Sequence, residues 1–368
     1  MDIKKLVKPN IRSLRAYQAK EIPCRIKLDA NESPYGFKAF KSLKTNRYPD
    51  PEARALKKLI ARDLKVKPEQ ILVGNGSDEL IYYLIMTFGG PVLYPAPTFS
   101  MYGIISQALG EKKIEIPLDK NFDLDERAIL KEIKKKKPKL IFLSSPNNPT
   151  GNSFSSKRIL KIIKFTSSLA PPVKGRGPNG TLRPPSSIVV VDEAYQAFSV
   201  NKSFLPLLKK YKNLVVLNTF SKIGLAGLRV GYMTANTEII EQSNKVRLPF
   251  NLNSLSQEIT VKTLKNRKLL RSYIRTIVAE RKKLLSGMKK IKDIRPYPSD
   301  ANFILFKIYP VRNKNSNGAE NADALHKKLL KQGVLIRNMQ GIVDNCLRVT
   351  VGTPEENTIF LKNLKKLL

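Results

Sequence analysis

The chain has 368 residues, of which 42% are hydrophobic, so it is long enough to bury a core shared by more than one domain. Its two cysteines, Cys24 and Cys346, lie far apart, and its only histidine is His326. These counts argue against a Cys/His zinc site and against a histidine-based catalytic triad.

The formal net charge of +37 first suggests a protein that binds nucleic acid. The lysines, however, are spread over many segments with amphipathic helical patterns, and few alternate with aromatic residues. Solvated helix faces are therefore the preferred interpretation, and nucleic-acid binding stays the alternative. A field of this sign would also attract a phosphorylated substrate.

The ends and the hydropathy of the chain predict a cytoplasmic protein. Residues 1–10 are basic, but no apolar run follows them, so we expect no signal peptide. No stretch reaches the roughly 18–20 apolar residues that a membrane-spanning helix needs. Two distant thiols are consistent with a reducing compartment.

In the first two thirds of the chain, short apolar runs alternate with helical patterns. Strands are expected at 71–73, 91–94, 140–144, 188–191 and 214–218, and helices at 52–66, 79–88, 125–136 and 156–166. Asp50 is the expected N-cap of the first helix, with Pro51 in its first turn. Because the strand at 188–191 is apolar at every position, it should be covered on both faces. The alternation predicts an α/β fold with a doubly wound, mostly parallel sheet.

From residue 254 the pattern changes to that of a smaller α+β domain. We expect a domain at 47–253, a smaller one at 254–368, and a segment at 1–46 that packs with the smaller domain. The expected elements of the smaller domain are a long basic helical stretch to 291, strands at 303–308, 334–337 and 347–351, and helices at 322–331 and from 354. The segments 171–185 and 311–321 resemble inserted loops.

Four polar motifs follow predicted strands. The turn Gly74–Asp78 precedes a helix, whose free N–H groups could bind a phosphate, although such a turn is as often purely structural. The segment Ser145–Gly151 also follows a strand, where open sheets bind their ligands. Asp192 ends the most apolar strand, so its carboxylate needs a partner, either a helix N-terminus or a cationic ring nitrogen. Lys222 follows the strand at 214–218 among hydroxyl side chains and can act as an amine nucleophile.

With these motifs in this order, the sequence resembles the histidinol-phosphate aminotransferases, which are pyridoxal-phosphate enzymes of fold type I. The resemblance extends from about residue 28 to the C-terminus. It is carried by LDANESPYG (28–36), RYPDP (47–51), PTFSMY (97–102), SSPNNPTG (144–151), VDEAY (191–195), TFSK (219–222) and LRVTVGTPEEN (347–357).

The resemblance implies a role for each residue around pyridoxal 5'-phosphate. Lys222 would bind the cofactor covalently and then act as the general base, and Asp192 would pair with its ring nitrogen. Tyr195 and Asn148 would hydrogen-bond the ring oxygen, and Tyr102 would stack on the ring. The cofactor phosphate would be held by Gly76, Ser77, Asp78, Thr219, Ser221 and Arg229.

One departure concerns Arg229, because its spacing from Lys222 is one residue shorter than in most relatives. The resemblance also implies a homodimer in which Tyr48 reaches into the neighbouring subunit's site.

The implied reaction moves an amino group from histidinol phosphate to 2-oxoglutarate, giving imidazole acetol phosphate and glutamate in histidine biosynthesis. Arg348 would bind the substrate's phosphate or carboxylate. Arg337 and Tyr17 would help with the phosphate, with a surface arginine and simple packing as their alternatives, and Asn31 would support substrate placement. Rival functions are a threonine-phosphate decarboxylase, an aromatic amino-acid aminotransferase, and a nucleic-acid-binding protein on a retained aminotransferase scaffold.

Overall fold

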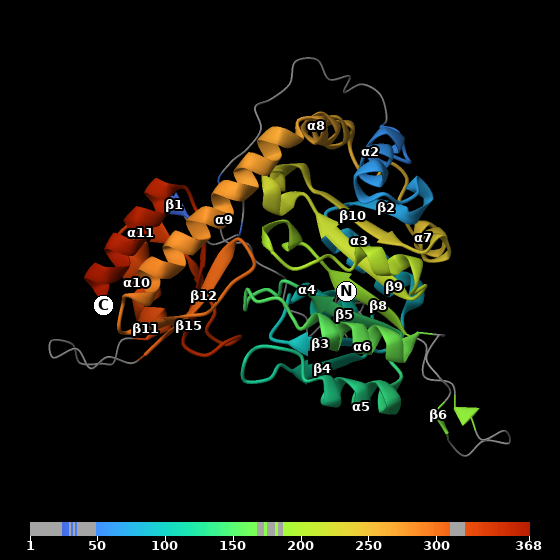
Figure 1. The fold of residues 1–368 in the computed structure, drawn as a ribbon, viewed down its shortest axis with the longest axis horizontal. Coiled ribbons are helices and arrows are strands. Elements are labelled where there is room, and N and C mark those ends of the chain that lie inside the picture. The colour runs from blue at the N-terminus through green and yellow to red at the C-terminus, as the bar shows by residue number, and fades with distance from the viewer. Residues whose placement is uncertain are drawn as a thin grey trace, which may run out of the picture.

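Two β-sheets organise the chain (Figure 1). The computed structural model describes residues 24–28, 31, 34, 49–167, 173–174, 181–182, 187–309 and 321–368. Within these residues, a seven-stranded sheet, here called the large sheet, is built by the segment from Ile71 to Ala235. A four-stranded small sheet is built by the segment from Ile294 to Thr350.

The large sheet has the strand order β2-β10-β9-β8-β5-β3-β4. Only β10 runs antiparallel to its neighbours, so the expected mostly parallel α/β sheet is confirmed. The sequence analysis missed β4 and β10. The bounds are β2 (Ile71–Asn75), β3 (Val92–Ala96), β4 (Lys113–Pro117), β5 (Leu140–Ser144), β8 (Ile188–Asp192), β9 (Leu214–Thr219) and β10 (Val230–Ala235).

Helices cover both faces of the large sheet, as a doubly wound fold requires. Val190 packs in a core with α3, α4 and α7, whereas its neighbours Val189 and Val191 pack in a second core with α5 and α6. Both faces of β8 are therefore buried, which explains its uninterrupted apolar sequence. The helices of this part are α2 (Arg54–Leu64), α3 (Ser77–Phe88), α4 (Met101–Ala108), α5 (Glu126–Lys136), α6 (Ser156–Thr166) and α7 (Thr237–Asn244).

The first helix begins later than expected. Ala53, not Asp50, occupies the N-cap position of α2, and it has a left-handed backbone with φ of 44°. Asp50 nevertheless provides acceptors for backbone N–H groups at the start of the helix, because its carboxylate accepts hydrogen bonds from Glu52 and Arg54.

The small sheet is antiparallel, with the order β11-β12-β15-β14. Ile304 and Leu347 face a core shared with α9, α10 and α11, and the other face of the sheet carries Leu305 and Cys346. The bounds are β11 (Ile294–Pro296), β12 (Phe303–Ile308), β14 (Arg337–Asn338), β15 (Cys346–Thr350), α8 (Ser254–Lys265), α9 (Arg267–Lys289), α10 (Ala322–Lys331) and α11 (Pro354–Leu367).

The long helix expected from 254 to 291 is two helices. It breaks at Asn266, whose ψ of 56° is not helical. Near the N-terminus, β1 (Ile26–Lys27) pairs in parallel with β13 (Val334–Leu335), and Ile26 and Leu28 enter the core beneath the small sheet.

The remaining elements are short. The strands β6 (Val173–Lys174) and β7 (Thr181–Leu182) pair with each other. The 3-10 turns are η2 (Pro68–Gln70), η3 (Gln196–Phe198), η4 (Leu205–Lys209), η5 (Ser221–Ile223) and η6 (Ala226–Leu228).

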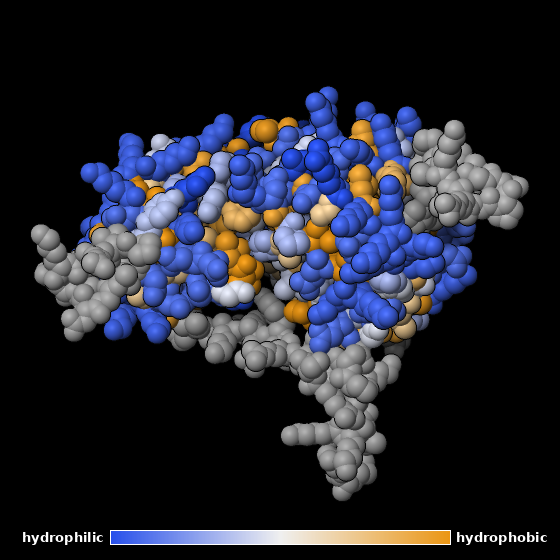
Figure 2. Space-filling view, turned by 90° about the horizontal axis from the view of Figure 1, so that it is seen from below, coloured by the Kyte–Doolittle hydropathy of each residue, from blue (hydrophilic) through white to orange (hydrophobic). Residues whose placement is uncertain are grey.

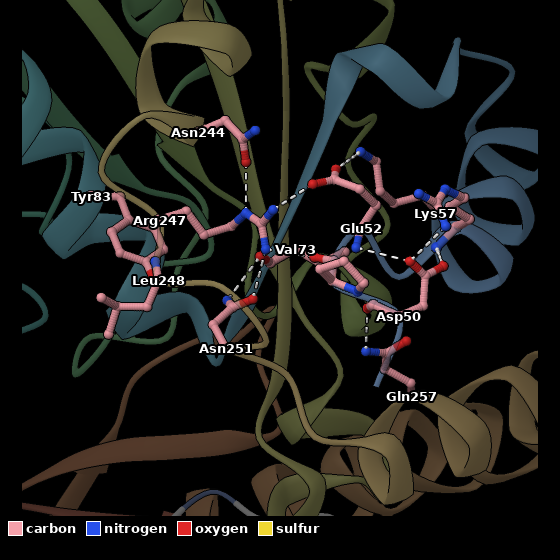
Figure 3. Close-up of polar contacts among 12 residues, drawn as sticks. Asp50, Glu52, Lys57, Val73, Tyr83, Asn244, Arg247, Leu248, Asn251 and Gln257 are labelled. Carbon is pink, nitrogen blue, oxygen red and sulfur yellow. Dashed lines mark hydrogen bonds and ion pairs between the residues drawn. The ribbon is translucent and has the colours of Figure 1, made fainter. Parts of the chain in front are cut away.

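A polar network around Arg247 ties the segment before α2 to the large sheet (Figure 3). The Arg247 guanidinium donates to the Pro51 carbonyl and the Asn251 side chain, and it forms an ion pair of 2.6 Å with Glu52. Asn251 in turn donates to Glu79 at 2.7 Å. Segments far apart in the sequence thus meet at one buried guanidinium.

Hydrophilic side chains cover most of the molecular face seen in Figure 2, in keeping with the charge of the chain. Apolar residues on this face gather around a hollow near its middle. Across the described segments, the helices lack the combined length and apolar character needed to cross a membrane.

Candidate functional site

Three of the predicted site residues lie at one edge of the large sheet. β5, β8 and β9 are neighbouring parallel strands, so the residues that follow them emerge at the same edge. Asn148 follows β5, Asp192 ends β8, and Lys222 lies in η5 directly after β9. The carboxyl edge of parallel strands is where open α/β sheets bind their ligands.

Asp192 is a buried carboxylate with two hydrogen bonds. Its Oδ2 accepts from the Tyr102 hydroxyl at 2.6 Å, and its Oδ1 accepts from the Ala194 N–H at 3.0 Å. Burial raises the pKa of Asp192 from 3.8 to about 6, while these two hydrogen bonds and the charge of Lys222 lower it. A cationic partner near this carboxylate would lower its pKa further and so favour its charged form.

Tyr102 lies in the core beside Asp192. Its side chain is 0% exposed, lies parallel to Phe142 with ring centroids 4.8 Å apart, and donates its hydroxyl proton to Asp192. The predicted stacking of Tyr102 on a cofactor ring stays a prediction. Tyr102 supports Asp192 from inside the core.

Phe99 is a second aromatic residue near Asp192, and the sequence alone did not single it out. It lies three residues before Tyr102 in the same PTFSMY motif, is only partly buried, and packs edge-on against Tyr102 at 5.6 Å. Because it is partly exposed, Phe99 is available to stack on a ring at this edge. Two aromatics share this motif, and burial distinguishes them.

Lys222 and Tyr195 lie together. The Lys222 Nζ is 5.7 Å from the centroid of the Tyr195 ring, and Lys222 is near enough to lower the pKa of Asp192. The Tyr195 hydroxyl accepts a hydrogen bond of 3.3 Å from the Asn31 side chain. The Tyr195 ring meets Phe303 of the small sheet edge-on at 5.2 Å, so residues of both sheets hold it.

The turn Gly74–Asp78 forms a cradle at the N-terminus of α3. Gly76 has a φ of 86°, and a side chain there would lie 2.4 Å from the Arg229 guanidinium. Gly231 on β10 lies under the turn, and a side chain there would lie 2.6 Å from the backbone of Gly76 and Ser77. Both glycines keep free the N–H groups and positive dipole of the helix end, which suits a phosphate.

Hydroxyl groups and Arg229 surround this cradle. The Thr219 hydroxyl donates to the Ser221 hydroxyl at 3.0 Å, and Arg229 donates to Ser221 at 3.3 Å and to Asp78 at 3.2 Å. Despite the short spacing from Lys222, Arg229 therefore reaches the cradle. Its left-handed backbone, with φ of 54°, turns the chain from η6 into β10.

Arg348 joins the small sheet to this edge of the large sheet. Its Nη1 hydrogen-bonds the Asn148 side-chain oxygen, and its guanidinium lies 5.1 Å from the Phe303 ring centroid. Arg337 on β14 is its direct cross-strand partner and is exposed. Two cations at paired positions of neighbouring strands repel each other. Binding of an anion near both guanidinium groups would reduce this repulsion.

Asn31 has a left-handed backbone and lies between Tyr195 and the small sheet. Tyr48 and Tyr17 lie outside the described residues, so their predicted roles remain predictions.

The arrangement has a counterpart among known proteins. A family model described as aminotransferase class I and II matches residues 17–171 and 183–364. The chain belongs to this family. In the structure, Lys222, Asp192 and the turn Gly74–Asp78 all end or follow strands at one edge of the large sheet.

The relatives of this aminotransferase include histidinol-phosphate aminotransferases, as the sequence resemblance predicts. One from Aquifex aeolicus is 40% identical, with 98% of each chain covered. One from Caldanaerobacter subterraneus subsp. tengcongensis is 37% identical over 100% of this chain and 99% of its own length. A crystal structure from Sinorhizobium meliloti in complex with pyridoxal-5'-phosphate has a TM-score of 0.79 at 21% identity, covering 98% of this chain and 97% of the other.

The residues of this aminotransferase fit pyridoxal phosphate. A carboxylate that needs a cationic partner, a lysine amine and a glycine cradle for a phosphate are separate requirements, and Asp192, Lys222 and Gly76 meet them at one edge. By contrast, no cluster of metal-ligating side chains occurs in the described part of the chain.

Replacing Tyr102 with phenylalanine should weaken cofactor binding. The loss of its hydrogen bond raises the pKa of Asp192 above about 6, so the carboxylate holds a cationic ring nitrogen less well. We expect about tenfold weaker binding, because a hydrogen bond to a charged group contributes about 1.5–3 kcal/mol. Spectrophotometric titration of the cofactor-free protein measures this.

Tyr94→Phe is the matched control, because Tyr94 donates an equally short hydrogen bond, 2.7 Å, to Glu115 away from the edge. Equal losses of cofactor affinity in the two variants would contradict the role of Tyr102.

Glu193 makes the stability of the cofactor-free protein depend on pH. Burial raises its pKa from 4.5 to about 7, although Phe204 and Ser203 donate hydrogen bonds to it. The folded state thus binds the proton more tightly than the unfolded state, so this contribution to stability is complete below pH 4.5 and is lost as the pH rises to about 7.

In Glu193→Gln this titration is absent. The free energy of unfolding of the wild type, relative to the variant, should therefore fall across that pH range in urea unfolding experiments. A difference that stays constant with pH would contradict the assignment.

Proposed function

We propose that this aminotransferase uses pyridoxal phosphate to move an amino group between L-histidinol phosphate and 2-oxoglutarate, giving imidazole acetol phosphate and glutamate in histidine biosynthesis. The observation that carries the proposal is the cross-strand pair of Arg337 and Arg348, with Arg348 bonded to Asn148 at the sheet edge where Lys222 also lies. Two relatives named histidinol-phosphate aminotransferase match 98–100% of this chain at 37–40% identity.

The chain's own residues would hold the cofactor at several points. Lys222 would bind it covalently, Asp192 would accept a hydrogen bond from its protonated ring nitrogen, and Tyr195 and Asn148 would contact its ring oxygen. Tyr102, as the resemblance implies, or the more exposed Phe99 would stack on the ring. The phosphate would lie over Gly76 on the N–H groups of Ser77 and Asp78, with the hydroxyls of Thr219 and Ser221 and the guanidinium of Arg229 around it.

Proton transfer falls to Lys222. When bound, the cofactor supplies a cationic ring that withdraws electrons from the reacting carbon of the substrate. The Lys222 amine would take the proton from that carbon and hold it for return. Asp192, whose charged form is favoured by the hydrogen bonds from Tyr102 and Ala194, would keep the ring nitrogen protonated.

Arg348 would bind whichever acidic group the substrate presents. Histidinol phosphate has no carboxylate, so its phosphate would lie near Arg348, with Arg337 adding a second cation. Glutamate would place a carboxylate on Arg348 in the other half of the reaction. Tyr17 and Asn31 were expected to assist, and only Asn31 lies in the described part of the chain.

We also propose a cytoplasmic homodimer. Apolar side chains are exposed on α3 and on the loop after α7: Tyr82, Met86, Leu248 and Phe250, which are 40%, 51%, 67% and 41% exposed. Exposed apolar groups of this kind favour a protein partner. The proposed domains are 47–253 and 254–368, with 1–46 packed on the latter.

The three rival functions predict different experimental results. A threonine-phosphate decarboxylase would release CO₂, and an aromatic amino-acid aminotransferase would prefer an aromatic donor. A nucleic-acid-binding protein would bind DNA or RNA tightly with a steep dependence on salt. The arginine pair beside Lys222 favours a substrate with an anionic group.

The purified protein, mixed with histidinol phosphate and 2-oxoglutarate, should form glutamate. Borohydride should trap the cofactor on the peptide that contains Lys222, and Lys222→Ala should abolish both results. The absence of glutamate would refute the substrate assignment, and a trapped adduct on another lysine would refute the site.

Replacing Arg337 with glutamine should separate the two half-reactions. We expect the KM for histidinol phosphate to rise about tenfold, because a charge-assisted contact to the phosphate is lost, while the KM for 2-oxoglutarate changes less than about twofold. Steady-state kinetics with each substrate varied measures this. Arg295→Gln, an exposed arginine on the opposite edge strand β11, is the control and should change neither value.

A further inference from the structure

We propose that Asn31 and Thr350 act as positioning residues for the Tyr195 hydroxyl, so that this hydroxyl donates its proton to the bound cofactor. The inference rests on the proposed function. It replaces the expected direct contact of Asn31 with the substrate by a contact through Tyr195.

Every polar group of Asn31 has a partner, although the side chain is 2% exposed. Its N–H donates to the Thr350 hydroxyl at 3.0 Å, and its carbonyl accepts from the Asn302 side chain at 2.9 Å. Its side-chain oxygen accepts from the Thr350 hydroxyl at 2.9 Å, and its side-chain NH₂ donates to the Tyr195 hydroxyl at 3.3 Å. Asn31 thus connects Tyr195 to the small sheet.

Thr350 determines which way the Asn31 amide points. The Thr350 hydroxyl already accepts the Asn31 N–H, and it gives its single proton to the Asn31 side-chain oxygen. In this orientation the amide oxygen lies at Thr350 and the NH₂ group faces Tyr195. The left-handed backbone of Asn31, with φ of 54°, is held in place by the same contacts.

The direction of the last hydrogen bond decides what Tyr195 can do. Because Asn31 donates to the Tyr195 oxygen, the hydroxyl proton of Tyr195 is not used in this contact. It is left to point away from Asn31 and to donate to an acceptor such as the ring oxygen of the cofactor. An aspartate at position 31 would reverse this direction by accepting the proton.

The same pair of strands also fixes the ring of Tyr195. Phe303 of β12 and Thr350 of β15 are direct cross-strand partners, and Phe303 packs edge-on against the Tyr195 ring at 5.2 Å. Arg348 lies two residues before Thr350 on β15, next to Asn148. One strand therefore carries both the proposed substrate-binding guanidinium and the hydroxyl that orients Asn31.

The test follows the visible absorbance of the bound cofactor against pH in the holoenzyme. A hydrogen bond from Tyr195 to the cofactor's ring oxygen withdraws charge from it, so losing that donor raises the pH midpoint of the absorbance change. We expect Tyr195→Phe to raise the midpoint by about one pH unit and Asn31→Ala to raise it by roughly half a unit. Asn31→Asp should raise it at least as much as Asn31→Ala.

The double variant is decisive. If Asn31 acts through the Tyr195 hydroxyl, Asn31→Ala adds no shift in the Tyr195→Phe background. Thr350→Val should raise the midpoint as much as Asn31→Ala does. Thr350→Ser, which keeps the hydroxyl, should have the same midpoint as the wild type. Asn213→Ala removes another asparagine that bonds to neighbouring segments, Thr166 and Ser187, and should leave the midpoint unchanged.

Additive shifts in the double variant would overturn the inference, as would an unchanged midpoint in Asn31→Ala. A higher KM for the substrate with an unchanged midpoint would mean that Asn31 contacts the substrate directly. These results leave the proposed function intact. A wild-type protein that shows no visible band with pyridoxal phosphate would overturn both the proposed function and this inference.

Discussion

The structure depends on a carboxylate buried at the end of a central parallel strand. Asp192 follows four apolar residues of β8, which pack alternately against the cores on the two faces of the sheet, so its charge lies at a place with little water. Burial favours the neutral acid, and the hydrogen bonds from Tyr102 and Ala194 oppose it. The balance leaves a group that is stabilised by a cation from outside, which is the basis of its proposed part in the reaction.

The sequence predicted the features that depend on local pattern. The strands at 140–144 and 303–308 and the helix at 156–166 have the expected bounds, because an apolar run or a helical period ends there at a clear polar boundary. Asp192 and Lys222 could be placed at one edge, since successive parallel strands end on the same side of a sheet. The family resemblance then supplied their proposed roles.

What the sequence did not predict depends on contacts between distant residues. β10 carries Gly231 and Tyr232 and runs antiparallel between two parallel neighbours, an order that no local pattern encodes. Tyr102 and Phe99 have similar side chains in one motif, and only the packing of Phe142 and Asp192 buries the first and leaves the second partly exposed. The contact of Asn31 with Tyr195 joins residues 164 positions apart.

The network around Arg247 has a consequence for how the protein would lose its ligand. Arg247 binds the Pro51 carbonyl and the Glu52 carboxylate. It also donates to Asn251, which donates to Glu79, and Glu79 accepts the Asn75 N–H in the glycine turn. Displacement of either end must strain the hydrogen bonds in between. By thermodynamic reciprocity, an anion that tightens the turn would also tighten the distant segment, and loosening that segment would weaken anion binding by the same free energy.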